Sequence, residues 1–196
     1  MFGIDAELLI DHAWGYETCR MSDIKNYHSE EHSLSNGQVL MRNYSFEEAL
    51  VIVREMTDNL ALDLFEKGLV TSSLTLWIAY DHRYEHEASK GTVKLERESN
   101  SSKKIIDAVE DLYLRIADRY TGIRRIEVCA NRVAPESYVQ YSLFDDPKQT
   151  DKERHLQEAV LNVKQRYGKN AIMRGSNLLE CSTYRERNEQ IGGHRA

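Results

Sequence analysis

The feature that most constrains the fold of this chain is a repeated change of hydrophobic period between about residues 35 and 135. In residues 70–80, VTSSLTLWIAY, the even positions from 74 on are Leu74, Leu76, Ile78 and Tyr80, which is the period of a strand that buries one face. Residues 45–68 and 103–120 instead repeat apolar side chains every three or four positions, which is the period of an amphipathic helix. Such changes of period predict helices packed against a sheet.

Three further segments, residues 37–45, 92–97 and 122–133, are candidate strands. The order of elements is therefore β-α-β-β-α-β, which predicts an α+β two-layer sandwich of split β-α-β type. Two helices would cover one face of the sheet and leave the other uncovered. A mixed polar set is expected on the uncovered face: Thr75, Trp77, Lys94, Arg125 and Glu127. Such a face suits contact with a large, hydrated partner.

The two helices of this domain carry signals at their ends. Ser45 precedes Glu48 by three residues, which is the spacing of a capping box, and Gly68 can end the first helix. The second helix is expected to bury an apolar side that extends as far as Tyr120.

The segments outside this domain are assigned by their local patterns. Residues 1–15 are expected to form a short helix from a larger unit, and residues 16–34 a linker to the domain at 35–135. Residues 136–150 are a connector, followed by a C-terminal helix and a basic tail over 151–196. The C-terminal helix is expected to bury one apolar stripe: Leu156, Ala159, Val160, Val163 and Tyr167.

The net charge of −6 is distributed unevenly along the chain. Residues 1–50 hold nine acidic and three basic residues, so that segment accounts for the whole excess and residues 51–196 are balanced. A local field can therefore favour an anionic partner despite the total. Three dispersed cysteines without a C-x-x-C pair, and the lack of a long apolar run or signal peptide, predict a cytoplasmic protein without a membrane partner.

Signals for catalysis are weak in this sequence. It has no glycine-rich phosphate loop, no G-x-S-x-G and no H-E-x-x-H. His82 and His86 are four residues apart, but they lie in a charged loop without a third ligand, so solvated histidines are favoured over a metal site. The prediction is that these residues contain no catalytic and no metal site.

Basic residues on two predicted strands suggest contact with nucleic acid. Arg124 and Arg125 lie on the last strand, and Lys94 lies on a predicted neighbour. Cations on a sheet face can follow a phosphate backbone without reading its sequence. The interspersed Glu96 and Glu127 leave open the alternative of an ordinary exposed sheet with alternating charges.

Four stretches of the sequence resemble the C-terminal part of Y-family translesion DNA polymerases, in particular the UmuC/ImpB/MucB/SamB group of Gram-positive bacteria. GIDAELLIDHAWGYE is similar to the end of the thumb's helix-hairpin-helix, and SLSNGQVLMRNYS to the first strand of the little-finger domain. GIRRIEVCANRV is similar to the last strand of that domain, and RERNEQIGGHRA to the end of this group's chains.

This resemblance implies the little-finger fold and a role in holding template-primer DNA during error-prone synthesis, in DNA damage tolerance and the SOS response. In the family the sheet lies in the major groove and contacts the DNA backbone. Carried over by position, the implied DNA contacts are Ser33, Ser35, Asn36, Arg42, Lys94, Arg124 and Arg125.

The catalytic palm of these polymerases has no counterpart in the sequence. The resemblance therefore implies a fragment of a longer polymerase that would be inactive alone and would bind no cofactor itself. The Mg²⁺ ions for nucleotidyl transfer would be bound by carboxylates of the palm.

A short motif in the connector resembles the bacterial sliding-clamp motif Gln-x-Ser/Asp-Leu-Phe. The sequence Gln140-Tyr141-Ser142-Leu143-Phe144 matches every specified position, so the implied clamp contacts are Gln140, Ser142, Leu143 and Phe144. Leu143 and Phe144 would enter an apolar pocket while Gln140 fixes the register. The alternative is that both apolar side chains pack against the C-terminal helix.

A second functional hypothesis remains beside the polymerase one. The domain could be a stand-alone α+β interaction module that uses its open sheet face for a protein partner and has no role with DNA.

Overall fold

The computed structural model describes residues 6–17, 19–26, 33–83, 85–137, 146–191 and 194–195 of the chain. It divides into two compact units, residues 1–31 and residues 32–196, which are described separately.

The first unit contains two short helices, α1 (Ala6–Ala13) and α2 (Met21–Asn26). Gly15 follows α1 with a φ of 76°, a left-handed conformation that suits glycine at a helix end. At the start of α2 the Arg20 amide donates a hydrogen bond to Asp23 Oδ2 at 2.9 Å. The predicted linker over 16–34 thus contains a short helix, which this side-chain cap supports where the apolar period is too weak to indicate one.

The second unit is built on one antiparallel sheet with the strand order β1-β4-β2-β3. The strands are β1 (Ser33–Tyr44), β2 (Leu69–Tyr80), β3 (Ser89–Ser99) and β4 (Ile123–Asn131), and the short β5 (Ala134–Pro135) extends the sheet beside β2. Because β4 pairs with both β1 and β2, those two strands run parallel with β4 between them. This is the split β-α-β arrangement, and the predicted α+β fold is confirmed.

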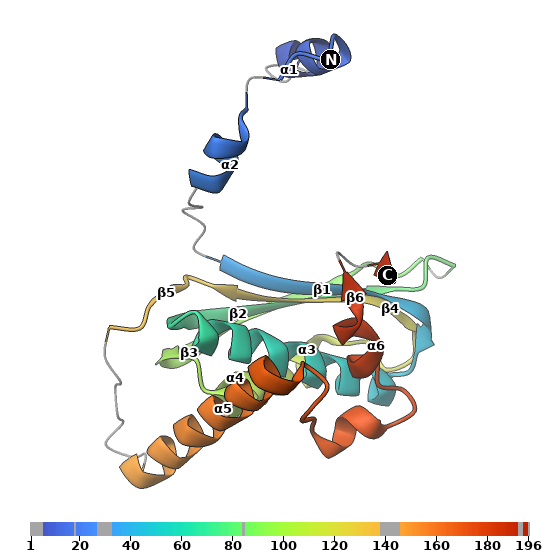
Figure 1. The fold of residues 1–196 in the computed structure, drawn as a ribbon. Coiled ribbons are helices and arrows are strands. Elements are labelled where there is room, and N and C mark those ends of the chain that lie inside the picture. Colours follow the sequence, from blue (N-terminus) through green and yellow to red (C-terminus); the bar gives the residue numbers. More distant parts are fainter. Residues whose placement is uncertain are drawn as a thin grey trace. The chain divides into compact units, whose positions relative to one another are not determined.

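Two long helices, α3 (Phe46–Glu66) and α4 (Ser102–Ile116), lie on the same face of this sheet (Figure 1). The predicted capping box is present: Ser45 Oγ accepts from the Glu48 amide at 3.2 Å, and Glu48 Oε2 accepts from the Ser45 amide at 2.9 Å. Between helices and sheet lies one apolar core, which includes the even positions of β2 and the inward side of β4: Leu74, Leu76, Ile78, Ile126, Val128 and Ala130.

The helix α4 ends earlier than the sequence pattern predicts. Ala117 has an extended backbone with a ψ of 135°, so the chain leaves the helix after Ile116. Tyr120 is consequently 96% exposed, and its predicted place on the buried side is wrong. The helical spacing that brought Tyr120 into register does not continue past the point where the chain turns toward β4.

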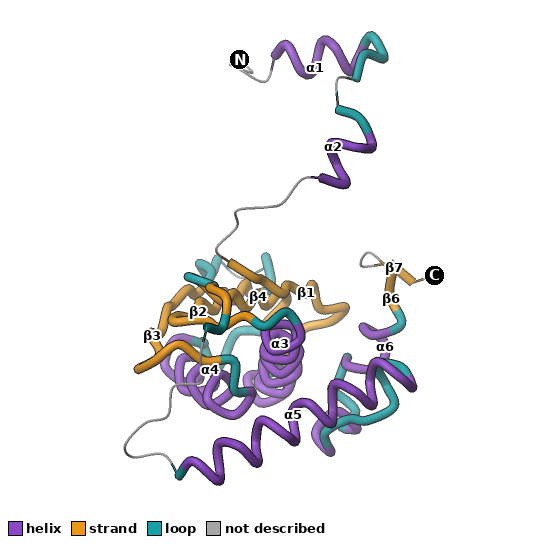
Figure 2. The backbone as a smooth tube through the Cα atoms, turned by 60° about the vertical axis from the view of Figure 1, so that its left-hand side comes forward, coloured by secondary structure: helices purple, strands orange, loops and turns teal. Residues whose placement is uncertain are grey.

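A third helix, α5 (Pro147–Tyr167), lies on the far side of α3 and α4 from the sheet (Figure 2). Asp146 caps it, with Pro147 in its first turn, so it begins four residues before the predicted start. After it come the short elements η2 (Gly175–Leu178), α6 (Tyr184–Asn188), β6 (Gln190–Ile191) and β7 (His194–Arg195). In the described part of the chain, the structure shows no helix long and apolar enough to span a lipid bilayer.

The predicted apolar stripe of α5 is buried only in part, since Val160 and Val163 are half-buried. Leu156, from the predicted buried stripe, is 65% exposed, whereas the neighbouring Gln157 is 8% exposed. Tyr167 and Ala159 are exposed as well. The surface on which the helix lies offers polar backbone and side-chain groups, so the helix turns its hydrogen-bonding side inward.

One glycine marks a close approach between sheet and helix. A Cβ added at Gly91 of β3 would lie 2.9 Å from Leu112 Cδ1 of α4 and 3.1 Å from Ile116 Cγ2. We expect Gly91→Val to destabilise the domain by about 1–3 kcal/mol through overpacking, measured by chemical denaturation. Gly37→Val on β1 is the matched control, because a Cβ there meets Glu127 at an ordinary 3.7 Å. Equal stability of the two variants would contradict the close approach.

Candidate nucleic-acid interface

The face of the sheet away from α3 and α4 carries rows of side chains that the strand pairing aligns. In β4 the outward positions are Arg125, Glu127, Cys129 and Asn131. Their neighbours across the sheet are Val39, Gly37, Ser35 and Ser33 on β1, and Ala79, Trp77, Thr75 and Ser73 on β2. The outer strand β3 adds Lys90 opposite Trp77, Thr92 opposite Thr75 and Lys94 opposite Ser73. We call these fifteen positions the open face.

A line of hydrogen bonds crosses the open face. The Thr75 and Thr92 hydroxyls lie 2.8 Å apart, and Asn131 Nδ2 donates to Thr75 Oγ1 at 2.8 Å. The Cys129 thiol in turn lies 3.4 Å from Asn131 Oδ1. These contacts join β3, β2 and β4 through their side chains, so the middle of the open face is held in a fixed arrangement.

A cation and a carboxylate share the centre of the open face. The Arg125 guanidinium lies 5.1 Å from the centroid of the Trp77 ring and 3.5 Å from Glu127 Oε2. Together with Thr75, Lys90, Thr92, Cys129 and Asn131, these three residues line a shallow hollow. The stacked ring positions the guanidinium, and Glu127 offsets part of its charge.

Arg124 and Arg125 occupy a bulge in β4. The β2 partners of Ile123 and Arg125 are consecutive residues, so β4 contains one extra residue across this step. Ile123 and Ile126 are both fully buried, although three positions separate them. The bulge therefore lets two adjacent arginines lie between two inward-facing isoleucines.

Four of the seven residues implied as DNA contacts lie on the open face: Ser33, Ser35, Lys94 and Arg125. Arg124 is partly buried in the adjacent bulge. Asn36 pairs with the inward-facing Val128, so it belongs to the side of the sheet that the helices cover. The structure thus assembles part of the implied set.

Arg42 is engaged elsewhere in the structure. Its Nη1 and Nη2 atoms donate to the two carboxylate oxygens of Glu48 at 3.0 and 2.6 Å, and its guanidinium lies 4.2 Å from the Tyr44 ring centroid. Hydrogen bonds from Arg42, and then from Ser45, lower the pKa of Glu48 to about 2. Arg42 therefore supports the start of α3 through the capping residue Glu48.

Lys90 and Thr92 are among the open-face residues that the sequence analysis did not single out. Lys90, Thr92 and Lys94 alternate along β3, which is the signal that could have found them. The strand was expected to begin at Thr92, after a polar loop, whereas β3 begins at Ser89. Gly91 fits under α4 and belongs to the strand.

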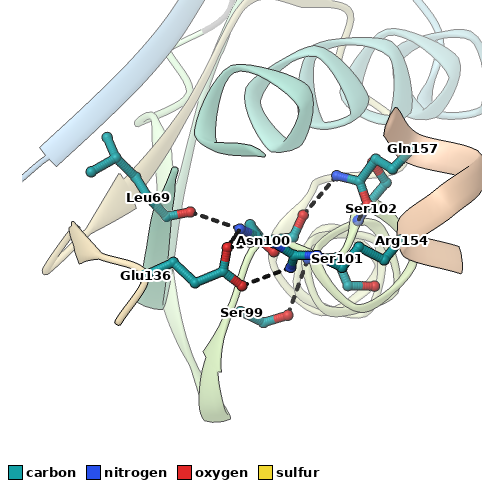
Figure 3. Close-up of polar contacts among 8 residues, drawn as sticks. All are labelled: Leu69, Ser99, Asn100, Ser101, Ser102, Glu136, Arg154 and Gln157. Carbon is teal, nitrogen blue, oxygen red and sulfur yellow. Dashed lines mark hydrogen bonds and ion pairs between the residues drawn. The ribbon is translucent and has the colours of Figure 1, made fainter. Parts of the chain in front are cut away.

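The clamp-like residues Gln140, Ser142, Leu143 and Phe144 lie outside the described residues, but a polar cluster joins the two chain segments that flank them. Arg154 of α5 donates to both carboxylate oxygens of Glu136, at 2.7 and 2.9 Å (Figure 3). Asn100 Nδ2 donates to Glu136 Oε2 at 3.2 Å and to the Leu69 carbonyl at 3.0 Å. We call Asn100, Glu136, Arg154 and Gln157 the anchor cluster.

Gln157 completes the anchor cluster from one turn further along α5. Its Nε2 donates to the Asn100 carbonyl at 2.8 Å, and its Oε1 accepts from the Ser102 amide at 3.4 Å (Figure 3). The Glu136 amide also donates to the Gly68 carbonyl at 2.8 Å. The chain before residue 138 and the chain after residue 146 are thus both attached to the same edge of the domain.

The predicted basic tail contributes to the fold in its described part. Tyr184 is 2% exposed, and Arg174 donates to both oxygens of Asp58 on α3 at 3.0 and 2.7 Å. Thr183 contacts Gln38 of β1, whose Nε2 donates to Thr183 Oγ1 at 2.9 Å. Sequence reasoning missed this docking because its contacts are mainly polar and leave no hydrophobic period.

The described strands and helices define a two-layer α+β domain in which α3 and α4 lie on one face of the sheet and the open face is the other. The chain belongs to the impB/mucB/samB family, since the model of that family's C-terminal domain matches residues 31–143. The predicted relation to the C-terminal portion of Y-family DNA polymerases is confirmed.

Two curated relatives carry the name DNA polymerase IV 2. The protein of Bacillus subtilis (strain 168) is 24% identical over 164 residues, which are 83% of this chain and 39% of that protein. The protein of Halalkalibacterium halodurans is 21% identical over 168 residues, 85% of this chain and 40% of that protein. The chain thus spans about two fifths of the length of these relatives.

Solved structures that match part of this chain include the little finger domain of PolIV in complex with the β-clamp processivity factor. That match has 12% identity and a TM-score of 0.41, and covers 58% of this chain and all of that one. A post-insertion binary complex of Dbh DNA polymerase matches at 14% identity and a TM-score of 0.38, covering 67% of this chain and 36% of that one.

Proposed function

We propose that this chain holds template-primer DNA and a bacterial sliding clamp for an error-prone translesion polymerase in DNA damage tolerance. The observation that carries the proposal is the open face, where Lys90, Lys94 and Arg125 lie on the side of the sheet opposite α3 and α4. Membership of the family and relatives named as DNA polymerases support DNA, rather than a protein, as the partner of the open face.

The chemistry of the open face suits the phosphate backbone of a duplex. Lysine and arginine side chains bind phosphates through charge and release counterions, which gives an affinity that is independent of sequence. The short side chains of Ser33, Ser35 and Gly37 on β1 let a duplex approach the sheet closely. The hydrogen bond between Thr75 and Thr92 holds neighbouring strands of the face together while the cations contact the DNA.

The clamp part of the proposal rests on the motif at residues 140–144. Leucine and phenylalanine side chains would bind an apolar pocket on the clamp, with Gln140 fixing the register. A short peptide of this kind binds weakly alone, but its effect multiplies when the same chain also holds DNA. Induction in the SOS response is part of the proposed role.

We expect Lys90→Ala combined with Lys94→Ala to weaken binding to a primer-template duplex and to reduce its salt dependence. If each lysine contacts one phosphate, the slope of log affinity against log salt should fall by about 2. Fluorescence anisotropy with a labelled duplex, from about 50 to 200 mM salt, measures both quantities.

The matched control is Lys148→Ala combined with Lys152→Ala, which removes two exposed lysines of α5. This control should leave the slope unchanged. A wild-type chain that fails to bind the duplex even at low salt would contradict the DNA role and favour the interaction module.

A further inference from the structure

A carboxylate lies among the cations of the open face, and nothing in a purely phosphate-binding surface calls for it. Glu127 lies on β4 between Gly37 of β1 and Trp77 of β2, near the middle of the sheet. Its side chain is partly exposed, and its Oε2 atom is 3.5 Å from Arg125 Nη2. A negative charge at this place repels the phosphates that the face is proposed to bind.

The pairing of Glu127 with Arg125 creates a competition for one guanidinium. Because the two residues are two positions apart on the same strand, their side chains share one face and stay within reach. From the neighbouring strand β2, the Trp77 ring contacts the same guanidinium, with 5.1 Å between Arg125 Cζ and the ring centroid. Any phosphate that binds Arg125 must therefore displace Glu127 or share the guanidinium with it.

We propose that Glu127 competes with the DNA backbone for Arg125. In the free protein the Glu127 carboxylate pairs with the Arg125 guanidinium, and this pairing lowers the affinity of the open face for duplex DNA. This inference rests on the proposed function and adds a feature that sets how strongly the open face binds DNA. A face that holds DNA weakly makes retention on DNA depend on a second attachment, which is the role proposed for the clamp motif.

The geometry gives Glu127 this role rather than that of a structural ion pair. Gly37 beside it carries no side chain, so the carboxylate stays open to an approaching partner. The two side chains are both partly exposed, so their ion pair contributes little to folding. Removing the carboxylate should thus change binding much more than stability.

We expect Glu127→Gln to bind the primer-template duplex roughly two- to five-fold more tightly than wild type at low salt, the range of one exposed ion pair. The gain should shrink as salt is added, because it is electrostatic. Glu158→Gln, which removes the same charge from an exposed position of α5, should leave the affinity unchanged. Thermal unfolding should be the same in all three proteins.

A double-mutant cycle separates competition for Arg125 from a general effect of charge. In an Arg125→Gln background, Glu127→Gln should lose most of its gain. A gain that persists in that background, or equal affinities of Glu127→Gln and wild type, would overturn the inference while duplex binding by wild type upholds the proposed function. Absence of duplex binding by wild type would overturn the proposed function and this inference with it.

Discussion

Replacing Leu143 and Phe144 together by alanine is expected to abolish association with a bacterial sliding clamp and to leave duplex binding intact. Burial of two such side chains contributes roughly 3–6 kcal/mol before ordering costs are subtracted. Since each 1.4 kcal/mol is about a tenfold change in affinity, the loss should be at least about 100-fold. Surface plasmon resonance with immobilised clamp measures the first quantity, and anisotropy with a labelled duplex measures the second.

The control for this prediction lies within the same motif. Tyr141 occupies the position that the motif does not specify, so Tyr141→Ala should retain clamp binding. Clamp binding by the double variant at wild-type strength would contradict the proposed motif. A fall in the thermal stability of the double variant, with no clamp binding by wild type, would instead favour packing of the two side chains against α5.

The sheet and its open face could be predicted because residues 74–80 of β2 alternate without interruption. The period of two assigns Leu74 and Leu76 to the core and Thr75 and Trp77 to the other face, and the structure agrees. The capping box at Ser45 was equally local, since it needs only residues three positions apart. Features fixed by a short stretch of chain are visible in the sequence.

Features that depend on a distant partner were not visible. The placement of Asn36 depends on its register with β4, which no local pattern specifies. Arg42 was implied as a DNA contact. In the structure both carboxylate oxygens of Glu48, at the start of α3, accept hydrogen bonds from the Arg42 guanidinium. Leu156 of α5 remained exposed while Gln157 was buried, because the surface beneath the helix presents hydrogen-bonding groups that favour Gln157.

We expect Arg154→Ala to be strongly destabilising for the attachment of α5. The Glu136 side chain is only 13% exposed, so without Arg154 its charge would be left largely buried with Asn100 as its remaining partner. Breaking a buried ion pair costs about 3–5 kcal/mol, and the 37% exposure of Arg154 reduces this to about 2–3 kcal/mol. Amide hydrogen exchange across α5 measures the local loss, and chemical denaturation measures any global one.

The effect should depend on pH with a definite sign. Hydrogen bonds from Arg154, and then from Asn100, outweigh burial and lower the pKa of Glu136 below its ordinary value. A lowered pKa in the folded state adds stability above the ordinary glutamate value of about 4.3 and loses it as the pH falls through the folded value. The difference between wild type and Arg154→Ala should therefore be constant near neutral pH and shrink in acid. Lys152→Ala on the same helix is the control, and a difference that does not vary with pH would show that the ion pair with Glu136 is not what holds α5.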